Sequence, residues 1–332
     1  MLKFLKQDNN TKRDIFINVS KKLKIQPEYI EKDFWVCLIL YILFTKSDYK
    51  NDIVFGGGTS LSKCYGVIKR FSEDIDIAIN WDKMGFDTNP NEGKSKTQRK
   101  LIVEKVRNST LQFIKNKLLL DIKEKIKNVL GLSLNVHIDE HYPDTIMVEY
   151  PKFFESNYIL PVVKIEVGSV SSSFLRQSKI IKSYLSDVYP NIFELSEVKI
   201  PTTLISRIFW DKAMVLHRIA NMPEDKKTPY RYARHYYDLY FLAKNKEVKH
   251  DALNDQNILK LAVDENTEFY RCNWAHYEDC LNKKFKLIPS NKRILELKKD
   301  YEQMKTMVFG DIPSFDEIIT SLSKLEKEIN KD

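Results

Sequence analysis

The chain has 332 residues, 43% of them apolar and 30% charged, with a formal net charge of +8. This balance excludes a disordered chain and is typical of a folded protein with one large or two modest domains. The longest apolar run, 34–44, is too short to span a bilayer. The first residues lack a signal peptide's apolar core, and four cysteines form no paired framework. We therefore expect a cytoplasmic protein with no membrane partner.

Apolar spacing and turn residues divide the chain into an α/β part followed by a helical part. Pro27 fits an early helical turn. Pro190, Pro201 and two threonines mark a boundary near 190–203. In chain order, we predict helices within 11–47, strands at about 52–56 and 73–80, a loop at 82–98, a long basic helix at 99–130, strands at 132–139, 145–150 and 159–169, and helices from about 201 onward.

The segment 53–79 is the most informative part of the sequence. An apolar strand runs into three glycines and a Thr-Ser pair, and a second strand then carries Asp74 and Asp76. Side chains two apart in a strand point the same way, so we expect these two carboxylates to project together. Two hard oxygen ligands suit Mg²⁺, whose other positions are filled by water and phosphate oxygens. The pattern predicts a site for a nucleoside triphosphate and its magnesium.

The glycine turn supplies the phosphate-binding half of this prediction. Gly56, Gly57 and Gly58 let the backbone approach a phosphate closely. Thr59 and Ser60 can cap the following helix, whose first N–H groups favour an anion. Either half alone is a weak signal, since D-x-D pairs are usually solvated strand edges. Their joint occurrence between two apolar strands favours the functional interpretation.

These residues resemble a known family. FGGGTSL followed by RFSEDIDIAI resembles the first motif of the AbiEii/AbiGii-type nucleotidyltransferase toxins, which belong to the DNA polymerase β-like superfamily. Three further segments agree with the amino-terminal helix, the lysine-bearing helix and the late Arg-and-Asp motif of that family. They are IEKDFWVCLIL (30–40), FWDKAMVLHRI (209–219) and RHYYDLYFL (234–242).

The resemblance implies a fold and an activity. The fold is α/β, with a nucleotidyltransferase domain in 1–200 built on a small mixed sheet, and a helical domain in 201–332 that completes the cleft. The activity is Mg²⁺-dependent transfer of a nucleotide from an NTP, with release of pyrophosphate, to an RNA acceptor such as the 3′ end of tRNA; Mn²⁺ is an alternative metal. The role is that of a toxin in a bacterial toxin–antitoxin, abortive-infection or phage-defence system, with a cognate antitoxin as partner.

The resemblance also implies roles for individual residues. Asp74, Asp76 and Glu166 bind the metal, and Glu166 departs from the Asp that relatives often carry. An exposed Lys164–Glu166 pair is the alternative for that position. The catalytic set is Asp74, Asp76, Glu166, Lys212 and Asp238, and the nucleotide-binding set is Gly57, Gly58, Thr59, Ser60 and Lys212.

The two residues from the helical part have interpretations of their own. Lys212 is implied to contact the phosphates, although an ordinary surface lysine is the alternative. Asp238 is implied to position and support the site. Arg231, Arg234, His235 and Asp238 fall at helical steps and could form one polar stripe, while the neighbouring aromatic residues favour a core.

Two further features leave alternatives open. Residues 99–130 hold nine basic residues against three acidic ones, which fits either a solvated helix face or a track for a phosphate backbone. Cys272, His276 and Cys280 share one face of a predicted helix, and packing is favoured over a zinc site. For the activity itself, transfer to a protein side chain and an inactive nucleotide-binding module remain the rivals.

Overall fold

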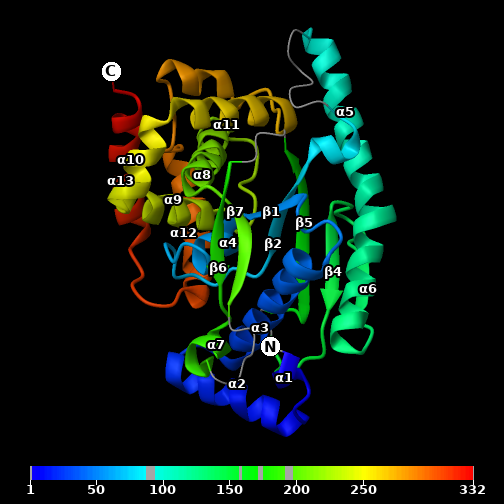
Figure 1. The fold of residues 1–332 in the computed structure, drawn as a ribbon. Coiled ribbons are helices and arrows are strands. Elements are labelled where there is room, and N and C mark those ends of the chain that lie inside the picture. The colour runs from blue at the N-terminus through cyan, green and yellow to red at the C-terminus, as the bar shows by residue number, and fades with distance from the viewer. Residues whose placement is uncertain (1, 87–93, 157–158, 171–174, 191–196, 332) are drawn as a thin grey trace. The chain divides into compact units, whose positions relative to one another are not determined.

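A computed structural model describes residues 2–86, 94–156, 159–170, 175–190 and 197–331 (Figure 1). Contacts divide the chain into two compact units. The sheet unit comprises 1–64 and 72–203, and the helical unit comprises 65–71 and 204–332. Our expected boundary lay at 200/201, whereas this division falls after Thr203. The assignment of the short segment 65–71 to the helical unit has no counterpart in the sequence prediction.

The sheet unit is built on one mixed sheet, which within the described residues has seven strands in the order β3-β4-β5-β2-β1-β7-β6. Strand β2 is antiparallel to β1 and parallel to β5, and β1 is parallel to β7. The predicted α/β class with a mixed sheet and a helical C-terminal region is confirmed. The strands are β1 (Ile53–Gly56), β2 (Ile75–Asn80), β3 (Asn135–Ile138), β4 (Thr145–Glu149), β5 (Val162–Val170), β6 (Arg176–Ile181) and β7 (Val198–Thr203).

The sequence prediction missed strands β6 and β7. We interpreted Pro201 as one of the residues that mark a boundary near 190–203, and proline also lacks the N–H that a strand ladder uses. In the structure Pro201 lies inside β7, opposite Ser178 of β6. Helices predicted from about 201 onward begin instead at Ile205.

Helix α3 forms much of the core of the sheet unit. Pro27 occupies its first turn, as predicted, and every residue from Tyr29 to Tyr41 is buried. The apolar run 34–44 is thus a buried helix that continues into a π-helical turn, and α3 packs against β5. No helix of the described residues is long and apolar enough to cross a membrane. The amino-terminal helices are α1 (Leu2–Leu5), α2 (Asn9–Leu23), α3 (Pro27–Tyr41) and η1 (Ile42–Lys46), with α4 (Gly57–Lys63) and α7 (Tyr184–Val188) further along.

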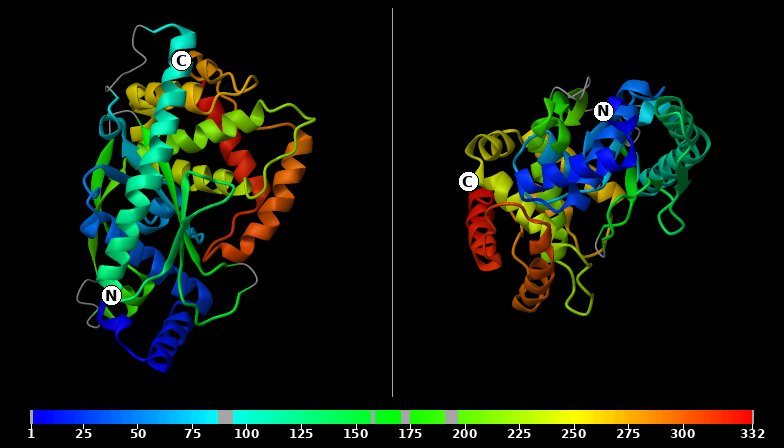
Figure 2. Two further views of the ribbon diagram at one scale, coloured as in Figure 1. Left: turned by 90° about the vertical axis from the view of Figure 1, so that its right-hand side faces the viewer. Right: turned by 90° about the horizontal axis from the view of Figure 1, so that it is seen from below.

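The predicted long basic helix is confirmed. It consists of α5 (Lys96–Phe113), η3 (Ile114–Leu118) and α6 (Leu119–Leu130), which Figure 2 shows as one continuous cyan-to-green ribbon. It begins inside the predicted loop 82–98, which also contains part of a short 3₁₀ turn, η2 (Trp81–Met84). Residues 85–86 and 94–95 are non-helical, as predicted, and 87–93 lie outside the described residues.

The helical unit departs from prediction at 270–282. Helix α11 ends at Phe269, and His276 adopts a left-handed backbone with φ +49° before a 3₁₀ turn begins. Cys272, His276 and Cys280 therefore do not share a helical face. Its elements are α8 (Ile205–Ala220), α9 (Ala233–Lys244), α10 (Lys246–Asn254), α11 (Gln256–Phe269), η5 (Tyr277–Asn282), α12 (Asn291–Met304), η6 (Lys305–Met307) and α13 (Phe315–Ile329).

Candidate active site

The glycine turn packs directly against Asp76. Strand β1 ends at Gly56, and Gly57 follows with φ +66°, a conformation that favours glycine. A Cβ atom added to Gly57 would lie 1.7 Å from Oδ2 and 2.7 Å from Cβ of Asp76. The Asp76 side chain thus occupies the space that a larger residue at position 57 would need. This contact joins the two halves of the sequence motif.

Asp76 lies in the centre of the sheet. Its register partners are Gly56 on β1 and Glu166 on β5. Partners on adjacent strands point to the same face, so Asp76 and Glu166 are side-by-side neighbours. The alternate positions Ile75 and Ile77 are buried, as the period-two pattern predicts. Strand β5 alternates in the same way, with its apolar residues inward and Glu166 exposed.

Asp74 departs from the prediction, because β2 begins one residue later at Ile75. Its backbone is held by the turn: Thr59 Oγ1 donates to the Asp74 carbonyl at 2.5 Å. The expected capping role of Thr59 and Ser60 is wrong. Gly56 is the N-cap of α4, and the Ser60 hydroxyl donates to the Gly57 carbonyl at 2.8 Å. Both side chains are buried and stabilise the turn and its junction with β2.

The carboxylates provide hard oxygen donors of the type that Mg²⁺ and Mn²⁺ prefer. Within the described residues, no three His, Cys, Asp or Glu side chains approach closely enough to form a ready-made metal site. Magnesium usually takes one or two carboxylates and completes its shell with water and phosphate oxygens. Among the predicted metal ligands, the structure therefore brings Asp76 and Glu166 together as neighbours, whereas Asp74 does not join them in one group of three.

Two ion pairs that the sequence prediction missed hold this region of the sheet unit. Asp33 on α3 pairs with Lys63 on α4, and it also accepts the N–H of Tyr184 at 2.7 Å. Burial alone would lower the pKa of Lys63, but the Asp33 carboxylate, together with Cys37 and Tyr184, raises it above its ordinary value. Lys32, the preceding residue, pairs with Glu73. The sequence signal was a run of three charges at the start of an apolar helix.

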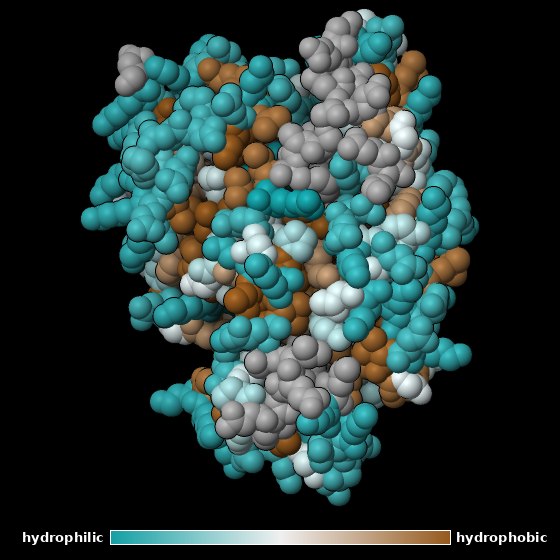
Figure 3. Space-filling model, viewed as in Figure 1, coloured by the Kyte–Doolittle hydropathy of each residue, from teal (hydrophilic) through white to brown (hydrophobic). Residues whose placement is uncertain are grey.

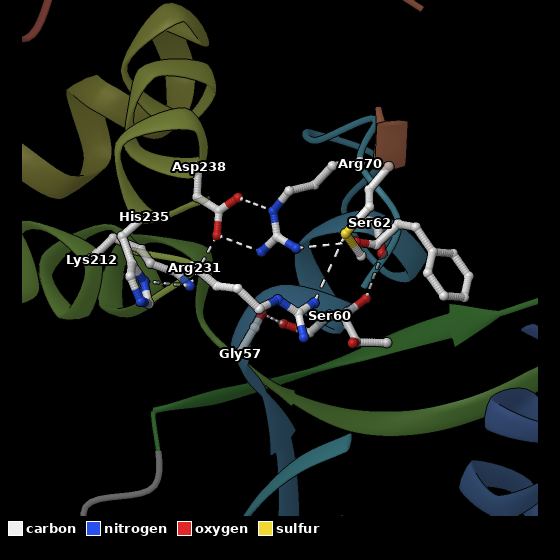
Figure 4. A network of polar contacts seen from close by, with 11 residues as sticks. Gly57, Ser60, Ser62, Arg70, Lys212, Arg231, His235 and Asp238 are labelled. Atoms are coloured by element: carbon white, nitrogen blue, oxygen red, sulfur yellow. Dashed lines mark hydrogen bonds and ion pairs between the residues drawn. The ribbon is translucent and has the colours of Figure 1, made fainter. Parts of the chain in front are cut away.

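A second cluster of charges lies in the helical unit, around Asp238 (Figure 4). Arg70 donates hydrogen bonds to both carboxylate oxygens of Asp238. Its Nε lies 2.7 Å from Oδ1, and its Nη2 lies 2.8 Å from Oδ2. Lys212 Nζ lies 3.0 Å from Oδ2 of the same carboxylate. All three residues are buried. Burial alone would raise the pKa of Asp238, but Arg70 and Lys212 together lower it below its ordinary value.

Lys212 is therefore a buried cation, and its interpretation as an ordinary surface lysine is wrong. Its Nζ also lies 3.5 Å from Nδ1 of His235. Burial, followed by the charges of Lys212 and Arg234, lowers the pKa of His235 well below the ordinary value. The imidazole is neutral at pH 7 and can accept from Lys212. These contacts engage two of the three N–H donors of the ammonium.

Arg70 lies in the chain segment that connects α4 to β2. The segment pairs with the chain near the C-terminus: Phe71 N–H donates to the Met307 carbonyl at 2.7 Å, and Phe309 N–H donates to the Lys69 carbonyl at 2.6 Å. Arg70 also forms a β-bridge with Val308. The segment 65–71 thus pairs within the helical unit, which the sequence did not indicate.

The predicted polar stripe is only partly correct. Helix α9 begins at Ala233, and Arg231 precedes it with φ +63°. The Asp300 carboxylate stabilises the start of α9, because it accepts hydrogen bonds from the backbone N–H groups of Arg231, at 2.9 Å, and Ala233, at 2.7 Å. The expectation that the tyrosines of α9 belong to the core is confirmed for Tyr236, Tyr237 and Tyr240, which are buried.

A family profile described as "Nucleotidyl transferase AbiEii toxin, Type IV TA system" matches residues 38–321, which is most of the chain. The chain belongs to the AbiEii nucleotidyl transferase toxin family. The predicted family and the predicted enzyme class, a nucleotidyltransferase, are confirmed. The same match supports the coarser functional prediction, a toxin of a toxin–antitoxin system.

Among solved structures, the nucleotidyltransferase toxin MenT4 from Mycobacterium tuberculosis H37Rv is similar to this AbiEii-family chain. The TM-score is 0.47 at 16% sequence identity, covering 95% of this chain and 96% of that one. A likeness at this level adds nothing to the family assignment. A search among curated proteins finds no significant match.

The AbiEii match includes the glycine turn, both aspartates of the D-x-D pair, Lys212 and Asp238. It begins at residue 38, so the buried charges Lys32 and Asp33 precede it.

Proposed function

We propose that the chain transfers a nucleotide from an NTP to an RNA acceptor, such as the 3′ end of tRNA, as the toxin of a toxin–antitoxin pair. One observation carries the proposal: Asp76 is held between the glycine turn and Glu166 on the central strands of the sheet. The family match supports nucleotidyl transfer. We place the reaction in the cytoplasm, where NTPs and RNA occur together, and infer a cognate antitoxin as the second partner.

Asp74, Asp76 and Glu166 would hold Mg²⁺, or Mn²⁺ in its place. When bound, such an ion would neutralise charge on the phosphates. The backbone of Gly57 and Gly58, which carry no side chains of their own, would offer N–H groups to the phosphates.

The remaining site residues have supporting roles in this proposal. The Ser60 hydroxyl shapes the glycine turn through its bond to the Gly57 carbonyl. Thr59 fixes the turn to Asp74. Lys212 would bind phosphate as a point charge through its third N–H donor. Asp238 orients that ammonium through the ion pair.

The reaction balances without a further reagent. An acceptor hydroxyl oxygen forms a bond to the α-phosphorus, and the bond from that phosphorus to the oxygen bridging the β-phosphate breaks. Pyrophosphate leaves with the electron pair, and the hydroxyl proton passes to solvent or to a carboxylate. The chain's contribution is to align the hydroxyl with the phosphorus, because positioning and charge stabilisation dominate such transfers.

An RNA acceptor is favoured by the exposed basic face of α5, η3 and α6. This face is opposite an apolar side that includes Val106, Phe113 and Ile122, all buried. Figure 3 shows a largely hydrophilic surface at the right-hand edge, where these helices lie in Figure 1. Such a face attracts a phosphate backbone independently of sequence. Its exposed basic residues are Arg99, Lys100, Lys105, Arg107, Lys115, Lys117, Lys123 and Lys127.

The acceptor is tested by incubating the purified chain with Mg²⁺, total RNA and each of the four α-labelled NTPs separately. We expect label in a tRNA-sized band with one preferred NTP, and loss of that label after ribonuclease treatment. Label in a protein band that resists ribonuclease would contradict the RNA acceptor in favour of a protein side chain. Magnesium-dependent NTP binding without label in any acceptor would instead favour an inactive binding module.

A further inference from the structure

Helix α3 buries a lysine that the proposed chemistry does not use. Lys32 is 2% exposed. Its Nζ donates to the carbonyls of Leu160, at 3.0 Å, and Val162, and lies 3.3 Å from the Glu73 carboxylate. A buried ammonium is strongly unfavourable unless it is paired and hydrogen-bonded. These three acceptors satisfy all of its N–H donors, which makes this lysine a fixed cross-link inside the sheet unit.

The partners of Lys32 lie at or just before the starts of the two strands β5 and β2. Leu160 and Val162 lie at the start of β5, which carries Glu166, and Glu73 immediately precedes Asp74. Strands β2 and β5 are parallel, so the first residues of both strands lie at the same end of the sheet. One ammonium therefore joins the points at which the chain enters these two strands.

We propose that Lys32 is a positioning residue that fixes Asp74 through Glu73. The inference rests on the proposed function, in which Asp74 is a metal ligand. Asp74 lies outside the regular ladder of β2, so other contacts must set its place. Thr59 holds its carbonyl from the side of the glycine turn, and the Lys32–Glu73 pair holds the residue before it from the side of α3.

The electrostatics of the pair agree with this geometry. Burial lowers the pKa of Lys32, while the carboxylates of Glu73 and Asp74 oppose that shift. Asp74 thus lies close enough to Lys32 to interact with its charge. Removal of the ammonium would take away the ion pair that Lys32 makes with Glu73 and so loosen the backbone at 73–74.

Lys32→Met, which keeps the chain length and removes the charge, should lower kcat by about 10- to 100-fold, as loss of an outer-shell partner typically does. The Mg²⁺ concentration for half-maximal rate should rise, whereas KM for NTP at saturating Mg²⁺ should change little. Hydrogen exchange of the amides at 73–76 should accelerate without nucleotide present. Glu31→Gln is the matched control, because Glu31 is also 2% exposed on α3 but accepts the Phe153 N–H at 2.8 Å instead.

A folded Lys32→Met variant with wild-type exchange at 73–76 would overturn the proposal, as would kinetics equal to those of Glu31→Gln. If Lys32→Met does not fold, Glu73→Gln provides the same test from the other partner. It should accelerate exchange at 73–76, and unchanged exchange would overturn the proposal. Wild type that transfers no label would contradict the proposed function, while the exchange experiment would still decide the role of Lys32.

Discussion

Gly57→Ala should reduce nucleotidyl transfer by about 100-fold or more, the effect of displacing a reacting group by an ångström. The new Cβ would fall 1.7 Å from the Asp76 carboxylate oxygen and 2.7 Å from Asp76 Cβ. Rotation of the carboxylate cannot relieve the second contact, so Asp76 and its backbone must shift. The left-handed backbone at Gly57 adds a cost of about 1–2 kcal/mol for any side chain. The rate of label transfer and the melting temperature measure the two effects separately.

Gly131→Ala is the matched control for this substitution. Gly131 also lies in the sheet unit and has a similar φ of +70°, but its added Cβ would meet no atom of the described residues within 4 Å. The Gly131→Ala variant should lose a comparable free energy of unfolding, because its backbone is also left-handed, and it should keep full transfer activity. A folded Gly57→Ala variant as active as Gly131→Ala would show that Asp76 need not occupy its observed place.

Asp238→Asn should destabilise the helical unit by about 3–5 kcal/mol, the usual loss when one partner of a buried ion pair is removed. The amide has the same shape as the carboxylate but removes the negative charge that Asp238 supplies to the buried cations of Arg70 and Lys212. Urea unfolding measures the loss. Asp316→Asn is the control, because Asp316 pairs with Lys298 on the surface and is 67% exposed. It should cost at most about 1 kcal/mol.

Lowering the pH should remove from the wild type the stability that the ion pairs of Asp238 with Arg70 and Lys212 contribute. The folded state holds the pKa of Asp238 below its ordinary value, so the unfolded state binds more protons as the pH falls below about 4. The Asp238 contribution is therefore complete at neutral pH and is lost as the pH falls through the unfolded and then the folded pKa. The stability difference between wild type and Asp238→Asn should shrink on acidification. A difference that stays constant down to pH 3 would contradict the ion-pair account.

The part of the site that could be predicted from sequence is local. The alternation of Ile75, Asp76 and Ile77 fixed which side chains face the core, because a strand has a period of two. The glycines before it predicted a close approach of the backbone to a phosphate, which stays a prediction; the structure shows that the Asp76 side chain fills the space beside Gly57. These inferences needed only residues near one another in the chain.

The part that could not be predicted depends on partners far apart in the chain. Arg70 and Asp238 are separated by 168 positions, and Lys32 and Leu160 by 128. A charged residue in a sequence gives no sign that it will be buried, because burial depends on which element packs over it. Lys212 was for this reason also compatible with a surface position. Similarly, Pro201 indicated a boundary, although its missing N–H is tolerated inside β7.

The central claim is that the Asp76 strand is the site of nucleotidyl transfer. It is tested most directly by comparing wild type, Asp76→Ala and Glu149→Ala for incorporation of α-label into the acceptor, with melting temperatures measured in parallel. Glu149 is a half-exposed carboxylate on β4 of the same sheet and serves as the control. We expect full transfer by wild type and Glu149→Ala, and none by a folded Asp76→Ala variant. Transfer at the wild-type rate by folded Asp76→Ala would contradict the assignment.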